Sequence, residues 1–169
     1  MSDRGFNVLI LCTGNSARSV LAEALLNHMS AEAGVGIKAF SAGSRPKLEV
    51  HPGALKVLKA KGIGTTGLRS KSWDEFASSS APRMDVVITV CNSAAGETCP
   101  IWPGSPARVH WGLDDPAAVV GSQKEVDAAF RKTFDELKGL IGRLVDVAIT
   151  SQDRGTLQAR IQEINLAAA

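Results

Sequence analysis

The sequence predicts an α/β protein, a three-layer sandwich with a central parallel sheet of about four strands. Two observations predict it. Short apolar runs rich in Val, Leu and Ile alternate along the chain with longer segments of helical periodicity. The chain has 169 residues, which suits one domain, and it contains no repeat, low-complexity tract or linker that would divide 1–169.

Four segments have the composition of short strands. The clearest are residues 6–11, which stop in a Thr-Gly-Asn-Ser turn, and residues 85–90, which lead into Cys91. Residues 37–41 and 108–111 are weaker candidates. Because helical segments separate most of these runs, we expect the strands to be parallel.

The positions of the helices are predicted from the spacing of apolar residues and from residues that commonly begin or end a helix. Residues 17–29 repeat apolar side chains at helical intervals and precede Gly34, while Pro52 suits the first turn of a helix over 52–61. A short helix is expected over 73–77. Ser122 and Glu125 form a capping box that opens the C-terminal helices, at about 122–167. The long first one carries a stripe of Val126, Phe130, Phe134, Leu137, Ile141, Leu144 and Ala148.

The composition argues against several classes of function. The net charge is +2, so nothing in the charge balance favours nucleic acid or an anionic membrane as a partner. Three cysteines are too few, and odd in number, for a disulfide-stapled secreted scaffold. No targeting signal precedes the first strand, so we expect a cytoplasmic protein whose thiols stay reduced.

The first motif joins the first strand to the first helix. Cys12 and Arg18 flank a loop that contains Gly14, and backbone N–H groups in such a loop bind oxyanions together with the helix N-terminus. Arg18 offers a fork for two oxygens, and the positive field favours the thiolate of Cys12. The expected oxyanion-binding residues are Thr13, Gly14, Asn15, Ser16, Ala17, Arg18 and Ser19. A buried, inert cysteine in a tight turn is the plainer alternative.

The second motif is a pair of thiols. Cys91 follows the 85–90 strand, and Cys99 lies eight residues later in the same Gly-containing loop. If the first and third strands are neighbours, Cys12 and Cys91 open onto one cleft, and a chain of thiols there passes a disulfide outward by exchange. Ordinary structural cysteines and a zinc site are the alternatives, although a C-x7-C spacing without a convincing His is unusual for zinc.

At these residues the chain resembles a known family. CTGNSARS after VLIL, SAGS at 41–44 and HWG-x-DDPA at 110–117 are similar to the low-molecular-weight protein tyrosine phosphatase family, and most of all to its arsenate reductase branch. The resemblance implies a phosphatase-like fold. It also implies that Cys12 attacks arsenate, that Cys91 attacks Cys12 and releases arsenite, and that Cys99 then moves the disulfide to Cys91–Cys99.

The resemblance implies further roles. No cofactor is bound, and the external reductant is thioredoxin, or glutathione with glutaredoxin. Asp115, directly before Pro116, is the expected general acid, since protonation of a departing oxygen needs a carboxyl within hydrogen-bond reach of the bound oxyanion, and Asp114 is the weaker candidate. An ordinary Asp-Pro turn is the plainer alternative. Asn15 and Ser19 shape the loop, and Glu23 with Ser41 holds a nearby cation. Many relatives have a second cysteine where this chain has Ala17.

Two other functions stay open. A phosphatase acting on phosphotyrosine or small phosphate esters needs only Cys12, Arg18 and Asp115. Against it, phosphatases of the family usually have tyrosines after the Asp-Pro, whereas this chain has Ala117-Ala118 and no tyrosine at all. A non-catalytic protein that binds arsenite or a metal through thiols would use the cysteines without needing the oxyanion loop.

Overall fold

The computed structural model describes residues 5–91, 102, 104 and 106–164. Its centre is a four-stranded sheet in the order β2-β1-β3-β4, with each neighbouring pair parallel. The α/β fold with a parallel sheet of four strands is therefore confirmed. The strands are β1 (Phe6–Cys12), β2 (Ile37–Gly43), β3 (Val86–Thr89) and β4 (Ala107–His110).

The helices match the expected segments, with some shifted ends. Helix α1 runs four residues past the predicted end, to the left-handed Gly34. Helix α5 stops at Gln162, before the end of the C-terminal helical region expected at about 122–167. The α-helices are α1 (Arg18–Ala33), α2 (Pro52–Ala60), α4 (Gln123–Thr150) and α5 (Arg154–Gln162), and the 3-10 helices are η1 (Trp73–Phe76) and η2 (Pro116–Ala118).

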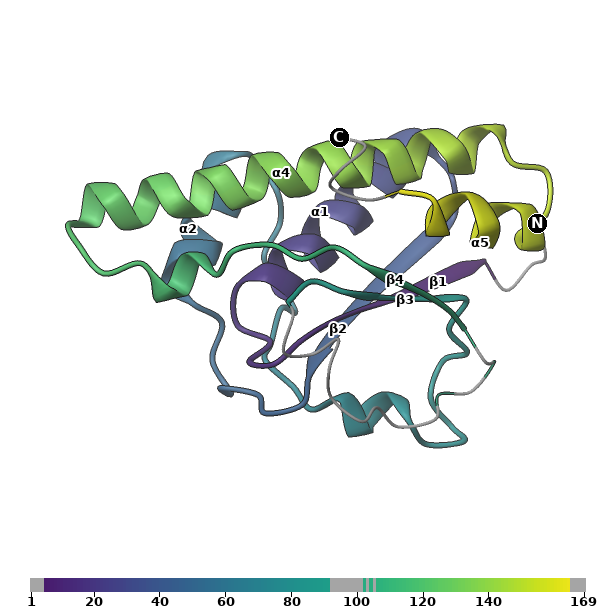
Figure 1. The fold of residues 1–169 in the computed structure, drawn as a ribbon, viewed down its shortest axis with the longest axis horizontal. Coiled ribbons are helices and arrows are strands. Elements are labelled where there is room, and N and C mark those ends of the chain that lie inside the picture. Colours follow the sequence, from purple (N-terminus) through teal and green to yellow (C-terminus); the bar gives the residue numbers. More distant parts are fainter. Residues whose placement is uncertain (1–4, 92–101, 103, 105, 165–169) are drawn as a thin grey trace.

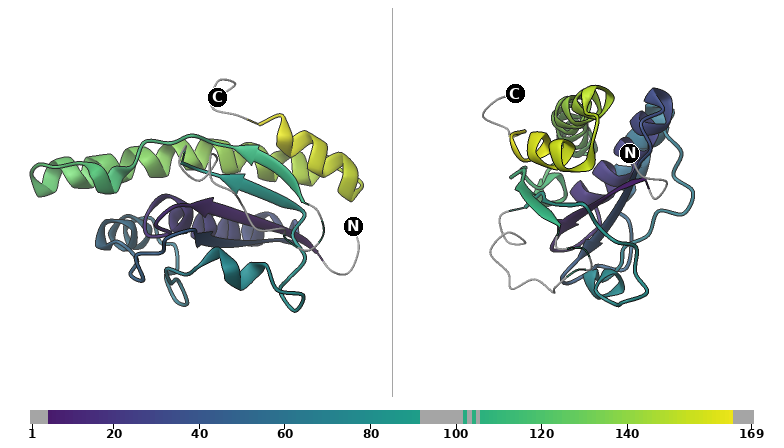
Figure 2. Two further views of the ribbon diagram at one scale, coloured as in Figure 1. Left: turned by 60° about the horizontal axis from the view of Figure 1, so that its bottom comes forward. Right: turned by 90° about the vertical axis from the view of Figure 1, so that its right-hand side faces the viewer.

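The two faces of the sheet are covered differently (Figures 1 and 2). Alternate residues of β1 point to opposite faces, as the pleat requires: Val8 and Ile10 join the larger core, and Leu9 and Leu11 join the smaller one. All four described α-helices pack on the larger core. The third layer consists of η1 and loops, and it contains no α-helix among the residues that the structure describes.

Several helix ends carry the expected signals. The Ser122 hydroxyl accepts a hydrogen bond from the Glu125 N–H at 3.2 Å, as the first half of a capping box requires. The α4 stripe is buried from Phe130 to Ala148, so this 28-residue helix spans one side of the core. Within the described residues, no helix is long and apolar enough to cross a membrane.

The topology predicts where a ligand would bind. From β1 the chain crosses to β2 on one side, and β3 lies on the other side of β1. Parallel α/β sheets bind ligands at the carboxyl ends of strands where the strand order reverses. Cys12 ends β1, and Cys91 lies two residues after β3, so both thiols meet at this switch point.

Candidate active site

A cavity of about 510 Å³ opens at the carboxyl ends of β1 and β3. It brings together Cys12, Arg18, Cys91 and Asp115, which the sequence predicts as site residues. Of the expected oxyanion loop, only Ser19 lies behind the cavity wall, fully buried. The lining residues are Cys12, Thr13, Gly14, Asn15, Ser16, Ala17, Arg18, Arg45, Lys47, Cys91, Leu113, Asp114, Asp115 and Ala117.

Backbone hydrogen bonds orient the loop that follows Cys12. The carbonyls of Thr13, Gly14 and Ser16 accept hydrogen bonds, at 2.9 to 3.0 Å, from backbone N–H groups of residues 45–51. In a planar trans peptide the C=O and N–H point in opposite directions, so the N–H groups that follow these carbonyls point away from residues 45–51. Consistent with this, the Asn15 N–H donates to Cys12 Sγ at 3.2 Å. The result is a concave row of donors suited to an oxyanion.

Two backbone positions make this loop shape possible. Asn15 has a φ of 45°, in the left-handed region that asparagine tolerates better than most residues. Gly43, at the end of β2, lies against the loop so closely that a Cβ there would be 2.4 Å from the Thr13 carbonyl oxygen. The glycine of the SAGS motif is thus required by the close approach of two backbones.

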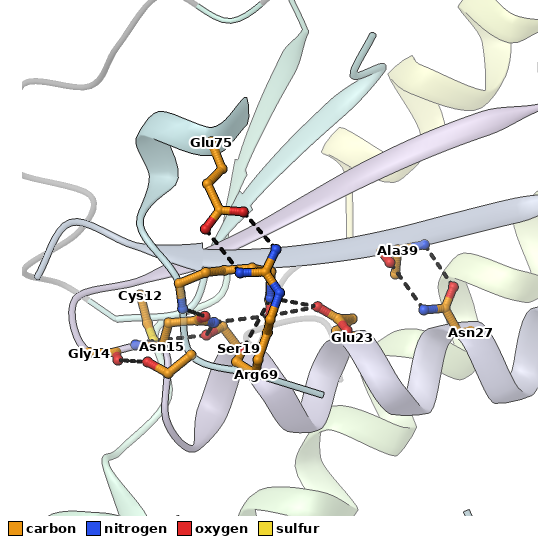
Figure 3. Close-up of polar contacts among 12 residues, drawn as sticks. Cys12, Gly14, Asn15, Ser19, Glu23, Asn27, Ala39, Arg69 and Glu75 are labelled. Carbon is orange, nitrogen blue, oxygen red and sulfur yellow. Dashed lines mark hydrogen bonds and ion pairs between the residues drawn. The ribbon is translucent and has the colours of Figure 1, made fainter. Parts of the chain in front are cut away.

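The Cys12 sulfur lies inside a network of hydrogen-bond donors (Figure 3). The amide of Asn15 donates to the Ser19 hydroxyl at 2.8 Å and to the Ser41 hydroxyl at 3.0 Å. The Ser19 hydroxyl lies 2.9 Å from Cys12 Sγ, and it is the donor of this pair when Cys12 is a thiolate, which has no proton to give. One N–H and one O–H therefore stabilise negative charge on this sulfur.

A buried ammonium and a mostly buried carboxylate complete the network. Ser41 donates to Glu23 Oε1 at 2.7 Å, and Lys71 Nζ lies 3.5 Å from the same oxygen. The backbone N–H of Lys71 also donates to the side-chain oxygen of Asn15. Burial lowers the pKa of the Lys71 ammonium below its usual 10.5, while the charge of Glu23 opposes that shift. The Lys71 ammonium thus lies beside Glu23, next to the Ser41–Glu23 pair where the resemblance implies a cation.

Outside this buried pair lies an exposed one. Arg69 makes a bidentate contact with Glu75, at 2.6 and 3.0 Å (Figure 3). The hydrogen bond from Arg69 lowers the pKa of Glu75 below its usual 4.5. Lys71 Nζ also donates to the Arg69 carbonyl, so the two pairs share one short segment of chain.

Arg18 and Asp115 form an ion pair at the cavity wall. The guanidinium donates to the Leu113 carbonyl at 2.9 Å and lies 3.5 Å from Asp115 Oδ2. The other Asp115 oxygen accepts the Ala117 N–H, which caps η2 and fixes the carboxyl's orientation. Asp114 lines the same wall. The two groups that the sequence assigned to binding and proton transfer are therefore adjacent.

Cys91 opens into the same cavity and is as deeply buried as Cys12, each with 3% of its surface exposed. The Thr13 hydroxyl lies 3.6 Å from Cys91 Sγ, so one residue of the oxyanion loop contacts the second thiol. The predicted third thiol, Cys99, lies outside the described residues. Among those that are described, no cluster of three or more His, Cys, Asp or Glu side chains suits a metal ion.

Two cations on the cavity wall were not predicted. Arg45 and Lys47 belong to the loop after β2, and the Lys47 side chain lies over Gly14, 3.2 Å from where a Cβ would be. The sequence contains them next to SAGS, but nothing in their spacing places them beside Cys12. The pairing of Lys71 with Glu23 was likewise missed.

The geometry agrees with a family comparison. Residues 7–155 match the model of the family described as low molecular weight phosphotyrosine protein phosphatase. The chain belongs to this family. The matched residues include the segment 12–19, and the family's fold is the sheet and helices described above. Among solved structures, a low-molecular-weight protein tyrosine phosphatase from T. tengcongensis matches with a TM-score of 0.66, at 27% identity, over 84% of this chain and 99% of that one.

Within this family, the similar proteins include several named arsenate reductase. Those of Halalkalibacterium halodurans and Bacillus subtilis are 38% and 37% identical to this chain, each over 77% of it and 88% of the relative. A thioredoxin-dependent arsenate reductase of Corynebacterium glutamicum has a TM-score of 0.65 at 29% identity, and the match spans 90% of this chain and 66% of that longer one. The arsenate reductase branch is thus well represented among the similar proteins.

Proposed function

We propose that this phosphatase-family protein is an enzyme that reduces arsenate to arsenite with its own thiols. The observation that carries the proposal is the presence of two buried thiols, Cys12 and Cys91, in one cavity beside an oxyanion-binding loop. A phosphatase needs the first thiol alone. The relatives named arsenate reductase support the same conclusion.

The first step is attack by Cys12. The thiolate, stabilised by Asn15 and Ser19, forms a sulfur–arsenic bond to arsenate held by the loop N–H groups and Arg18. An oxygen of arsenate leaves as water after protonation. Asp115 supplies that proton, since its carboxyl faces Arg18 at the cavity wall where the oxyanion binds.

The second step reduces arsenic. The Cys91 thiolate attacks Cys12 Sγ and forms a disulfide, and the electrons of the sulfur–arsenic bond pass to arsenic, which leaves as arsenite. Cys99 then attacks Cys91, Cys12 leaves as a thiolate, and the disulfide becomes Cys91–Cys99. An external thiol reductant, thioredoxin-like or glutaredoxin-like, reduces it. Such a cycle needs a reducing compartment, for which we propose the cytoplasm.

A second activity has support from the same cavity. Cys12, Arg18 and Asp115 together meet the needs of phosphate ester hydrolysis, with a cysteinyl-phosphate intermediate in place of the arsenic adduct. The family is described by that activity. We propose it as a residual activity, because it makes no use of Cys91.

Single Cys→Ser variants separate these activities. Purified proteins are assayed for arsenite release, with thioredoxin and its reductase as electron donor, and for hydrolysis of an aryl phosphate. Cys12→Ser is expected to lose both activities. Cys91→Ser and Cys99→Ser are expected to lose sustained arsenate reduction and to keep any hydrolysis.

Two results would contradict the proposal. Full thioredoxin-coupled arsenate turnover by Cys91→Ser would show that the reaction does not need the second thiol. Full turnover by Cys99→Ser under the same conditions would show that the disulfide does not pass through that residue. Thermal unfolding of each variant, compared with the unmodified chain, checks that a loss of activity is not a loss of fold.

A further inference from the structure

Helix α5 begins at the end of the sheet that lies away from the active cavity. Its first residue, Arg154, donates to the Gly5 carbonyl at 2.8 Å and pairs with Asp85, so this end lies where β1 and β3 begin. From there α5 packs beside the edge strand β4 and buries Leu157 and Ile161 in the larger core (Figure 2). Most of α5 lies after residue 155, where the match to the family model ends, so that match leaves its role open.

The other end of α5 reaches the carboxyl end of β4. Ile164, two residues after the last residue of α5, has a carbonyl that accepts the indole N–H of Trp111 at 3.0 Å. Trp111 directly follows β4, and none of its surface is exposed. Because a buried donor without an acceptor is costly, this hydrogen bond holds the indole in one orientation.

Trp111 begins the segment of the cavity wall that contacts Arg18. The backbone N–H groups of Trp111 and Leu113 donate to the carbonyls of residues 89–90, at 2.7 and 3.1 Å, so the pairing of β4 with β3 continues past the strand ends. The Leu113 carbonyl then accepts a hydrogen bond from Arg18 at 2.9 Å, and Asp115 forms the ion pair with the same guanidinium. One short segment therefore joins the end of α5 to the arginine of the oxyanion site.

We propose that Trp111 is a positioning residue for oxyanion binding: the end of α5 fixes its indole, and residues 111–115 then keep Arg18 directed at the oxyanion. A guanidinium binds two oxygens of an oxyanion well only when its planar fork is held in the right direction. The Leu113 carbonyl engages one N–H group of Arg18 and leaves others for the ligand. The inference rests on the proposed function only in that an oxyanion binds to the loop and Arg18.

The test removes the indole N–H and keeps the ring. In Trp111→benzothienylalanine a sulfur atom replaces the N–H, so the side chain keeps its size and loses its donor. Trp102→benzothienylalanine is the matched control. Trp102 is also buried and does not line the cavity, and its N–H has no hydrogen-bond partner within the described part of the chain. The same chemical change is thus made where no described bond is lost.

Phosphate binding and arsenate kinetics are compared for the two variants. In the Trp111 variant we expect the Kd for inorganic phosphate, measured by calorimetry, and the KM for arsenate to rise about fivefold, because one buried hydrogen bond is lost. The value of kcat should change less, since the thiols are untouched. A loss of fold alone would lower the amount of active protein without changing the Kd of the remainder. The Trp102 variant should match the unmodified chain in Kd and KM.

A second comparison asks whether the effect acts through Arg18. The Trp111 replacement is repeated in an Arg18→Lys protein, which lacks the planar fork. If the indole acts by directing that fork, the replacement should now change the Kd for phosphate by less than about twofold. A full fivefold rise in this background would show that the indole acts independently of Arg18, and would overturn the proposed role.

The contribution of α5 is tested with Ile161→Ala. This change removes a buried α5 side chain one turn before Ile164 and leaves the Ile164 carbonyl in the chain. Exchange of the Trp111 indole hydrogen, followed by NMR, should become faster, and the Kd for phosphate should rise by less than in the Trp111 variant. Unchanged exchange and an unchanged Kd would show that α5 does not hold the indole.

The outcomes separate this inference from the proposed function. An unchanged Kd for phosphate in the Trp111 variant, or an equal rise in the Trp102 control, would refute the positioning role and leave arsenate reduction unaffected. Conversely, the expected changes in phosphate binding in a protein that releases no arsenite would refute the proposed function and leave the positioning role standing.

Discussion

Cys12 and Cys91 follow neighbouring strands, line one cavity and are equally buried, yet their surroundings differ. Cys12 begins a loop that leads into α1, and a backbone N–H and a hydroxyl contact its sulfur at 3.2 and 2.9 Å. Cys91 instead lies two residues after the end of β3, with its Sγ 3.6 Å from the Thr13 hydroxyl.

The difference matches two chemical tasks. A nucleophile that attacks a bound oxyanion benefits from a thiolate held in one direction by preorganised donors. A thiol that must reach first one sulfur and then another benefits less from a fixed direction. The hydrogen bonds and ion pair that hold Cys12 in place continue through Asn15, Ser41 and Glu23 to Lys71. Substitutions along this series should therefore lower activity less the farther they lie from Cys12.

Among changes to the residues that hold Cys12 in place, the largest effect is expected from Gly43→Ala. The added Cβ would lie 2.4 Å from the Thr13 carbonyl oxygen and 3.0 Å from Asn15, and backbone atoms cannot move aside as a flexible side chain would. Displacement of the loop by about 1 Å should lower arsenate reduction roughly 100-fold. Steady-state arsenite release measures it.

Gly64→Ala is the matched control for this substitution. A Cβ at Gly64 meets nothing within 4 Å, and its φ lies outside the left-handed region. Its activity should equal that of the unmodified chain. If Gly43→Ala were as active as Gly64→Ala, the close backbone approach would not hold the loop in its active shape.

The second effect compares the two thiols directly. Ser19→Ala removes a donor to Cys12 Sγ and should lower turnover about tenfold, because a hydrogen bond to a charged group contributes about 1.5 kcal/mol. Thr13→Val removes the hydroxyl near Cys91 and should leave the first step unchanged. Alkylation of Cys12 by iodoacetamide at neutral pH, read by peptide mass spectrometry, should slow in Ser19→Ala only. Equal slowing in both variants would contradict the difference between the two sites.

A third and smaller effect on activity is expected at Lys71. The Lys71→Met variant leaves the Glu23 carboxylate buried without its ammonium, which should cost about 3 kcal/mol of unfolding free energy and about fivefold in activity. Urea unfolding measures the first quantity. Adding Glu23→Gln removes the unpaired charge and should recover most of the stability. If the double variant were as unstable as Lys71→Met, the ion pair would not explain the loss.

Sequence reasoning predicted the parts of the site that are close together in the chain. Residues 12–19 are contiguous, and their turn and helix signals are local, so their role follows from their order. Lys71 is different: its backbone N–H binds the side chain of Asn15, 56 residues away, and its ammonium reaches Glu23, 48 residues away. The spacing of residues along the sequence cannot predict such pairs, because they form only when β2 and the segment before η1 pack together. The asymmetry of the two sheet faces was missed for the same reason.

The smallest effect is expected where the network meets solvent, at Glu75. Its pair with Arg69 is exposed, with 44% and 59% of the side chains accessible, so Glu75→Gln should cost less than about 1 kcal/mol at pH 7 and leave arsenate reduction within twofold. The hydrogen bond from Arg69 lowers the pKa of Glu75 below 4.5, so its stabilisation is present above that pH and is lost as the pH falls through the folded-state pKa. Unfolding curves of the two proteins should therefore differ slightly at pH 7 and coincide near pH 2. A Glu75→Gln variant as inactive as Ser19→Ala would mean that the support of Cys12 extends to the surface, and that the decrease with distance is wrong.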